Sequence, residues 1–144
     1  MKLNEILQGL ELKETAADLS LEIEDVVYDS RRAGPGSLFV AVRGFQTDGH
    51  KYIANAVRAG AAAVLCEEAP EVQVPYVLVE DSRLALALSA KNFFRDPGSE
   101  VTLIGVTGTN GKTTTTVLLK HLLEKTVGAR VGLIGTNRNL IGDR

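Results

Sequence analysis

A glycine-rich stretch between an apolar run and a helical pattern constrains the fold of this 144-residue chain more than any other feature. The apolar run covers residues 101–106, Thr-Gly-Thr-Asn-Gly-Lys-Thr-Thr-Thr follows at 107–115, and helical spacing continues to residue 126. Strand, glycine-rich turn and helix in this order form a loop whose backbone N–H groups hold the phosphates of a nucleotide. A further predicted strand over 130–135 completes a βαβ unit, whose right-handed crossover predicts a parallel sheet in an α/β fold.

The residue types in this loop suit a nucleoside triphosphate and its magnesium ion. Gly108 and Gly111 have no Cβ, so the backbone N–H groups approach phosphate oxygens closely. Lys112 offers a positive charge to the outer phosphates, Thr113 offers a hydroxyl ligand to Mg²⁺, and Thr114 donates to an inner phosphate. The alternative is a glycine-rich turn with an incidental lysine, which the strand and helix on either side disfavour.

The loop departs from the common G-x-x-x-x-G-K-[ST] pattern of phosphate-binding loops. That pattern requires a glycine at position 106, where this chain has Val106, and Gly105 stands one residue too early. The departure indicates a particular class of nucleotide-binding protein rather than a generic one.

Composition and charge exclude several classes of protein. The net charge is −2, so neither a nucleic acid nor an anionic membrane surface is expected as a partner. No apolar run approaches the ~20 residues that cross a bilayer, and the amino terminus does not resemble a signal peptide. Cys66 is the single cysteine, which rules out an internal disulfide and is interpreted as a small buried thiol. The sequence therefore predicts a cytoplasmic globular protein.

Two lobes are expected, with a boundary at about residue 97. In the first lobe the predicted helices cover 2–9, 52–60 and 82–94, with Ser82 as a candidate N-cap, and the predicted strands cover 22–28, 37–42, 62–66 and 76–79. The sequence Asp-Pro-Gly-Ser at 96–99 ends the last helix, because proline disfavours helix for the residue before it. The predicted domains are residues 1–97 and residues 98–144.

The second lobe is small for an independent domain. It has about 45 residues, near the limit below which a chain cannot bury enough apolar surface. Both of its expected strands are apolar throughout, which is typical of strands covered by helices on both faces, and one helix covers only one face. We therefore expect the chain to be the front part of a longer protein, with the nucleotide-binding domain truncated.

Polar residues follow two predicted strands of the first lobe. They are Ser30, Arg31, Gln46, Thr47, Asp48 and His50. Because strand ends in α/β lobes commonly carry a binding site, these side chains are candidates for a small polar pocket. The alternative is structural, with Asp29 and Asp48 as turn and cap residues and Arg31 in a surface ion pair.

These motifs together resemble the Mur ligase family. The loop at 107–115 resembles its nucleotide loop, and Asp-Ser-Arg at 29–31 and Asp-Gly-His at 48–50 resemble motifs of its first domain. Val-Gly-Leu-Ile-Gly-Thr at 131–136 resembles the MurE branch, which ligates a diamino acid to UDP-N-acetylmuramoyl-L-alanyl-D-glutamate. The MurF branch, which adds D-Ala-D-Ala, shares the first-domain motifs but more usually has Gly-Ser-Asn-Gly-Lys in its loop, so it ranks second.

The resemblance implies an ATP-dependent, amide-forming ligase of peptidoglycan precursor synthesis that works through an acyl phosphate. An α/β lobe would bind the UDP end of the substrate, and the residues carried over to it are Tyr28, Ser30, Phe45, Gln46 and Thr47. The residues carried over to ATP are Gly108, Thr109, Asn110, Gly111, Lys112, Thr113 and Thr114. Lys112 would be the catalytic group and Thr113 the metal ligand, with ATP and Mg²⁺ as cofactors.

The implied substrates are a UDP-N-acetylmuramoyl dipeptide and a diamino acid, and no protein partner is implied. The domain that selects the amino acid would lie beyond Arg144, so the 144 residues alone are expected to be inactive as a ligase. Two other functions remain open. One is a generic phosphate-loop ATPase or kinase that ignores UDP-muramoyl compounds, and the other is a UDP-sugar-binding module without ligase activity.

Overall fold

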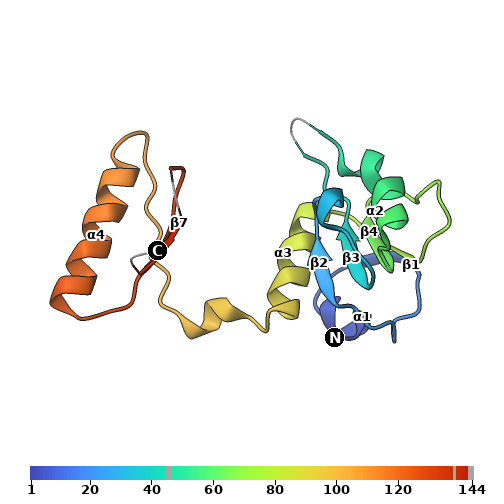
Figure 1. Ribbon diagram of the computed structural model, residues 1–144, viewed down its shortest axis with the longest axis horizontal. Coiled ribbons are helices and arrows are strands. Elements are labelled where there is room, and N and C mark those ends of the chain that lie inside the picture. Colours follow the sequence, from blue (N-terminus) through green and yellow to red (C-terminus); the bar gives the residue numbers. More distant parts are fainter. Residues whose placement is uncertain (45–46, 138, 143–144) are drawn as a thin grey trace. The chain divides into compact units, whose positions relative to one another are not determined.

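A five-stranded sheet with helices on both faces forms the first of two units in this chain (Figure 1). The computed structural model describes residues 1–44, 47–137 and 139–142. The first unit is Met1–Val101 and the second is Thr102–Arg144. The strand order in the sheet of the first unit is β1-β5-β4-β3-β2.

Four of the five strands run parallel, which confirms the predicted α/β class. The parallel strands are β2 (Asp25–Val27), β3 (Ser37–Val40), β4 (Ala63–Cys66) and β5 (Tyr76–Val79). Every residue of β3 and β4 is buried. Because both faces of these inner strands are covered, their sequences are nearly continuous apolar runs without alternation.

The edge strand β1 (Leu12–Ala16) was not predicted. It pairs antiparallel with β5, and all of its residues are exposed. Hydrogen bonds to β5, rather than burial, hold this strand in place, so the sequence Leu-Lys-Glu-Thr-Ala carries no apolar pattern. A charged edge strand also discourages pairing with another chain.

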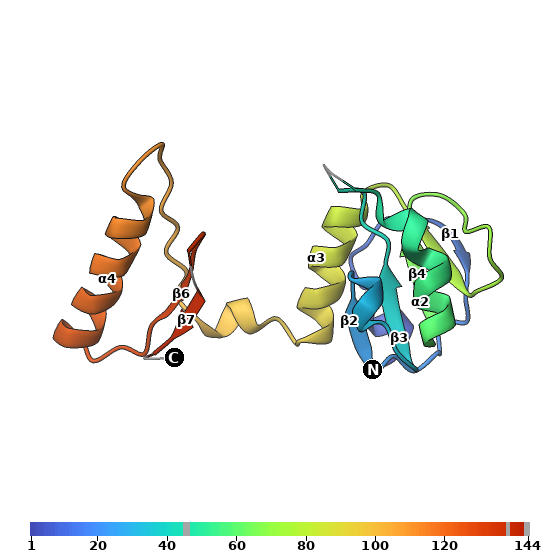
Figure 2. The same ribbon diagram turned by 45° about the horizontal axis from the view of Figure 1, so that its top comes forward.

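The helices of the first unit cover the two faces of the sheet. Figure 2 shows α3 (Ser82–Phe93) on the opposite side of the strands from α2 (Ile53–Ala59). The short helix α1 (Leu3–Ile6) packs into the same apolar cluster as α3. Two short 3-10 helices, η1 (Ser30–Arg32) and η2 (Gly49–Tyr52), contact α2. A third 3-10 helix, η3 (Pro97–Glu100), follows α3. No helix in the described ranges has the length and apolar character that crossing a membrane requires.

The N-cap of α3 differs from the predicted one. Asp81, not Ser82, caps the helix, and its side chain accepts hydrogen bonds from the backbone N–H groups of Arg83 and Leu84. An N-cap residue has an extended backbone and a side-chain oxygen that reaches the first turn, and Asp81 meets both conditions with φ −130° and ψ 105°. Ser82 is instead fully buried.

The second unit contains one long helix and a hairpin. The helix α4 (Lys112–Thr126) has the predicted start and end. The strands β6 (Gly132–Ile134) and β7 (Asn139–Ile141) pair antiparallel. Leu133 is buried where β6 contacts α4.

The expected parallel βαβ arrangement is not formed among the described residues of the second unit. Residues 102–107 form no strand, and β6 pairs with β7 instead of with them. A strand exists only when a neighbour accepts and donates its backbone hydrogen bonds, and the apolar side chains here are open to solvent, with Leu103 79% exposed. The expectation of a strand over 101–106 is therefore wrong for this structure.

Replacing Ser89 by alanine is expected to stabilise the first unit. Ser89 is fully buried in α3, and within the described residues its Oγ has no hydrogen-bond partner. An unpaired buried hydroxyl costs free energy, so the Ser89→Ala variant should gain about 1 kcal/mol in free energy of unfolding. Urea unfolding measures this gain. The control is Ser82→Ala on the same helix, which removes a bonded hydroxyl and should lose stability.

Candidate functional site

The amino end of α4 is open to an anion. Gly111 is the residue before the helix, with a left-handed backbone of φ 78°, and no side chain in the described ranges caps the first turn. The N–H group of Thr115 bonds to the carbonyl oxygen of Gly111, so the N–H groups of residues 112–114 have no partner within the helix. These donors and the helix dipole together favour a negative charge at this point.

Lys112 lies over the loop that precedes the helix. Its ammonium group donates to the carbonyl oxygens of Gly108 and Thr109, the second at 3.3 Å. Both contacts are exposed, so the ammonium group is accessible to a ligand. A phosphate oxygen is a stronger acceptor than either carbonyl, because a hydrogen bond between charged groups is stronger than one to a neutral acceptor.

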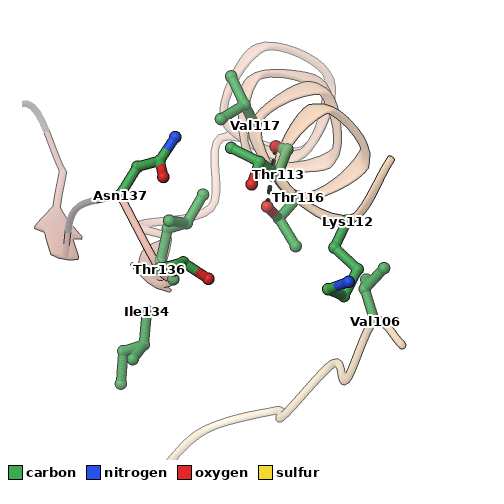
Figure 3. Close-up of a pocket in the computed structure, with 10 residues that line it drawn as sticks. Val106, Lys112, Thr113, Thr116, Val117, Ile134, Thr136 and Asn137 are labelled. Carbon is green, nitrogen blue, oxygen red and sulfur yellow. Dashed lines mark hydrogen bonds between the residues drawn. The ribbon is translucent and has the colours of Figure 1, made fainter. Parts of the chain in front are cut away.

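A hollow of about 210 Å³ lies beside the start of α4 (Figure 3). Its lining residues are Val106, Lys112, Thr113, Thr116, Val117, Leu133, Ile134, Gly135, Thr136 and Asn137. The hollow is smaller than the ~300–1,000 Å³ typical of small-molecule sites, so it accommodates part of a nucleotide rather than all of it. The sequence analysis did not predict Thr136 and Asn137 as part of this site. The feature that could have indicated them is the change from apolar to small and polar residues directly after the predicted strand at 130–135.

Thr113 fits the expected role of a single magnesium ligand. It lines the hollow next to Lys112, and no protein group in the described residues hydrogen-bonds to its Oγ1. The described residues contain no cluster of three acidic, histidine or cysteine side chains that would hold a metal ion alone. Mg²⁺ commonly binds through one or two protein oxygens together with phosphates and waters, so one hydroxyl beside a phosphate site suits it.

The Asp29–Arg31 pair occupies the turn after β2. The Asp29 carboxylate accepts from the Arg31 backbone N–H at 3.0 Å and from Nε and Nη2 of its side chain at 2.9 and 2.7 Å. These hydrogen bonds from Arg31 lower the pKa of Asp29 to about 2. The structural interpretation of both residues, as a cap and a surface ion pair, is therefore confirmed.

Ser30 and Thr47 follow neighbouring strands of the first unit. The strands β2 and β3 are parallel, and their carboxyl ends lie at the same edge of the sheet. Ser30 is half-buried, and its hydroxyl makes no hydrogen bond to any of the described residues. Tyr28 is 65% exposed, and the Thr47 hydroxyl lies 3.4 Å from the Tyr52 hydroxyl. Phe45 and Gln46, the two other predicted residues of this site, lie outside the described residues.

The remaining titratable candidates have structural roles. Cys66 is buried, and burial raises its pKa to about 12, so it is not a reactive thiolate. Nδ1 of His121 lies 2.9 Å from the carbonyl oxygen of Val117, one turn back on α4. Asp48 caps η2 by accepting from the backbone N–H of His50.

Comparisons with known proteins agree with the division of the chain into two units. The sequence matches the Mur ligase family catalytic domain over residues 22–101 and the Mur ligase middle domain over residues 106–143. A UDP-N-acetylmuramoyl-L-alanyl-D-glutamate–2,6-diaminopimelate ligase of Caldanaerobacter subterraneus subsp. tengcongensis is 47% identical over the whole chain, which covers 30% of that protein.

Two solved structures show the same likeness. The structure of a UDP-N-acetylmuramoyl-L-alanyl-D-glutamate–2,6-diaminopimelate ligase aligns with the whole chain at a TM-score of 0.74 and 25% identity, over 29% of its own length. The MurF ligase of Thermotoga maritima in complex with ADP aligns with 74% of this chain at a TM-score of 0.55 and 35% identity, over 24% of its own length. The chain spans about 30% of the length of the curated relatives it matches.

Proposed function

Because this chain belongs to the Mur ligase family, we propose that it supplies the UDP-substrate site and the ATP loop of a MurE-type ligase. Such a ligase adds a diamino acid to UDP-N-acetylmuramoyl-L-alanyl-D-glutamate with the consumption of ATP, in the synthesis of a peptidoglycan precursor in the cytoplasm. In this proposal residues 1–97 form the UDP-binding domain and residues 98–144 the beginning of the ATP-binding domain.

The open amino end of α4 carries the proposal. Its first N–H groups and the Thr113 hydroxyl have no hydrogen-bond partner among the described residues. Together with the Lys112 ammonium group they border one hollow, which is what a triphosphate with a magnesium ion requires. The ATP-binding residues are proposed to be Gly108, Thr109, Asn110, Gly111, Lys112, Thr113 and Thr114.

The carboxyl ends of β2 and β3 in the first unit are proposed to bind the uridine diphosphate part of the substrate. In the described part of the chain the Ser30 hydroxyl, at the carboxyl end of β2, has no hydrogen-bond partner, and the Thr47 hydroxyl is presented by the loop after β3. Tyr28 is exposed at the same strand end and offers an aromatic surface to the base. Phe45 and Gln46 complete the proposed set.

The proposed reaction transfers the terminal phosphoryl group of ATP to the free carboxylate of the D-glutamyl residue. The amine of the diamino acid then attacks the acyl phosphate, and the tetrahedral intermediate expels phosphate as the amide forms. Lys112 donates to oxygens of the transferring group and stabilises their charge, which makes it the proposed catalytic residue. Mg²⁺, held in part by Thr113, would neutralise charge on the same phosphates.

The diamino acid is preferred over D-Ala-D-Ala as the second substrate. The curated relatives that match the whole chain at 40–47% identity carry the name of a 2,6-diaminopimelate ligase. The MurF structures align with a smaller part of the chain, 74–87% of it. These findings favour the MurE-type reaction.

The Ser30→Ala variant is expected to bind UDP-N-acetylmuramoyl-L-alanyl-D-glutamate more weakly. Loss of a hydrogen bond to a charged diphosphate costs about 2 kcal/mol, or roughly a 30-fold loss of affinity. Calorimetric titration measures it. Ser99→Ala in η3 is the matched control, because this serine hydroxyl already donates to the carbonyl oxygen of Asp96. Equal affinity of wild type and Ser30→Ala would remove Ser30 from the proposed site.

The 144-residue chain alone is expected to form no tripeptide product from ATP, the UDP-dipeptide and a diamino acid. Its phosphate loop and hollow are largely exposed, whereas phosphoryl transfer to a carboxylate requires a site that excludes water. A coupled phosphate-release assay with chromatographic detection of the UDP-tripeptide measures this. Product formed in proportion to the added chain would contradict the expectation.

A further inference from the structure

A chain of polar contacts in the first unit ties the loop after β3 to the end of β4 and the start of α3. We name the five residues that make it, Arg43, Asp48, His50, Glu67 and Ser82, the polar latch. None of them belongs to the proposed UDP-binding set. The polar latch joins residues up to 39 positions apart in the sequence, as in the bond from the Arg43 backbone N–H to Ser82.

His50 occupies the centre of the polar latch. Its Nε2 accepts from the backbone N–H of Glu67 at 2.9 Å, so Nε2 carries no proton. Its Nδ1 therefore carries the proton and donates to the Asp48 carboxylate at 2.6 Å. A single tautomer thus connects η2 to the end of β4.

Glu67 and Ser82 extend the polar latch to α3. The Glu67 carboxylate accepts from the Ser82 hydroxyl at 2.6 Å and from its backbone N–H at 3.0 Å. The Ser82 hydroxyl, which is fully buried, also accepts from the Arg43 backbone N–H at 3.1 Å. Burial acts to raise the pKa of Glu67, but the hydrogen bonds from Ser82 and the charge of Arg43 outweigh it and lower the pKa.

The last contacts of the polar latch join Arg43 and Asp48, the two residues at the base of the loop after β3. Arg43 and Asp48 form an antiparallel bridge, and the Arg43 guanidinium lies 3.6 Å from carboxylate oxygens of both Asp48 and Glu67. The N–H group of Gly49 donates to the carbonyl oxygen of Val42 at 2.9 Å. A Cβ at Gly49 would lie 2.7 Å from the backbone N and O of Val42, so the two backbone segments approach too closely here for a residue with a side chain. Both sides of the loop base are therefore fixed.

We propose that the polar latch positions Thr47, beside the bridge between Arg43 and Asp48, for the uridine diphosphate part of the substrate. This inference rests on the proposed function of the first unit. The latch residues do not touch the ligand; they hold Thr47 in place before binding. A residue whose position is fixed in advance loses less conformational entropy when the ligand arrives, so the latch contributes affinity indirectly.

The test uses two His50 variants that differ in how many of the two His50 hydrogen bonds they keep. His50→Ala removes both hydrogen bonds, and His50→Gln keeps an acceptor at the distance of Nε2 for the Glu67 N–H. His50→Ala is expected to weaken binding of UDP-N-acetylmuramoyl-L-alanyl-D-glutamate roughly tenfold, and His50→Gln is expected to recover part of the loss. ATP affinity should not change. His121→Ala is the matched control, since that histidine lies on α4.

Amide hydrogen exchange gives a second readout that needs no ligand. In His50→Ala the amides of Gly44 and Gly49, which bond to Thr47 and Val42, are expected to exchange faster, while those of β3 keep their protection. Ser82→Ala, which cuts the latch at its other end, is expected to show the same local change. It serves as the test variant if His50→Ala does not fold.

The two readouts separate the possible outcomes. Faster local exchange together with weaker UDP-dipeptide binding supports the proposal. Faster exchange with unchanged affinity would show that the latch is only structural, and unchanged exchange would show that it does not hold the loop; either overturns the proposal. If the folded wild-type chain does not bind the UDP-dipeptide, the proposed function of the first unit fails and this inference fails with it.

Discussion

A Lys112→Ala chain is expected to bind ATP roughly 30- to 150-fold more weakly than the wild-type chain, a loss of about 2–3 kcal/mol. In the structure the ammonium group contacts the carbonyl oxygens of Gly108 and Thr109 above an uncapped helix start. We expect triphosphate binding to replace these neutral acceptors by charged oxygens, which bond more strongly. Alanine retains the helix propensity of this position, so the helix should remain intact.

Calorimetric titration with ATP in the presence of magnesium measures this loss. The matched control is Lys125→Ala, which removes an equal charge from the last turn of the same helix. Because Lys125 lies far along α4 from the loop, the control should leave ATP affinity within about twofold, as expected for a screened surface charge. Equal loss in the two variants would mean that Lys112 acts only through net charge.

A Gly60→Ala chain is expected to lose about 3 kcal/mol in free energy of unfolding of the first unit. Gly60 ends α2 with a left-handed backbone of φ 107°, which costs an L-residue about 1–2 kcal/mol. An added Cβ would also lie 2.9 Å from the backbone nitrogen of Pro35, and that turn leads directly into β3. The backbone of Pro35 cannot yield without moving a central strand, so the contact adds to the strain.

Urea unfolding followed by tyrosine fluorescence measures this loss, because all three tyrosines of the chain, Tyr28, Tyr52 and Tyr76, lie in the first unit. Gly9→Ala is the matched control. Gly9 also has a left-handed backbone, at φ 78°, but a Cβ there would meet nothing within 4 Å. The control should therefore lose only about 1 kcal/mol. If both variants were destabilised equally, the contact with Pro35 would contribute nothing.

Burial decided which strands of the first unit were predictable. The strands β3 and β4 are buried on both faces, and their sequences are apolar enough to be recognised without any partner in view. The strand β1 is exposed along its whole length and exists because β5 pairs with it, so its own residues contain no signal. The opposite error, a strand that was predicted but not formed, occurred at 101–106. This apolar run has no pairing partner in the described residues.

The candidate sites were predictable where they depend on local sequence. The turn at Gly111 and the start of the helix at Lys112 are determined by residues that are adjacent in the sequence, and both were predicted. The other wall of the hollow, with Thr136 and Asn137, required the hairpin of β6 and β7 to fold against α4. The polar latch was equally hidden, because Glu67 and Ser82 become partners of His50 and Arg43 only through the parallel order of the strands.

The central claim is that the chain carries two separate ligand sites, one for a UDP-muramoyl substrate and one for ATP. The most direct measurement is calorimetric titration of the wild-type chain with UDP-N-acetylmuramoyl-L-alanyl-D-glutamate, first alone and then with ATP and magnesium at saturation. We predict one-to-one binding of the UDP-dipeptide with the same affinity in both titrations. Competition between the two ligands, or no saturable heat from a folded sample, would contradict the claim.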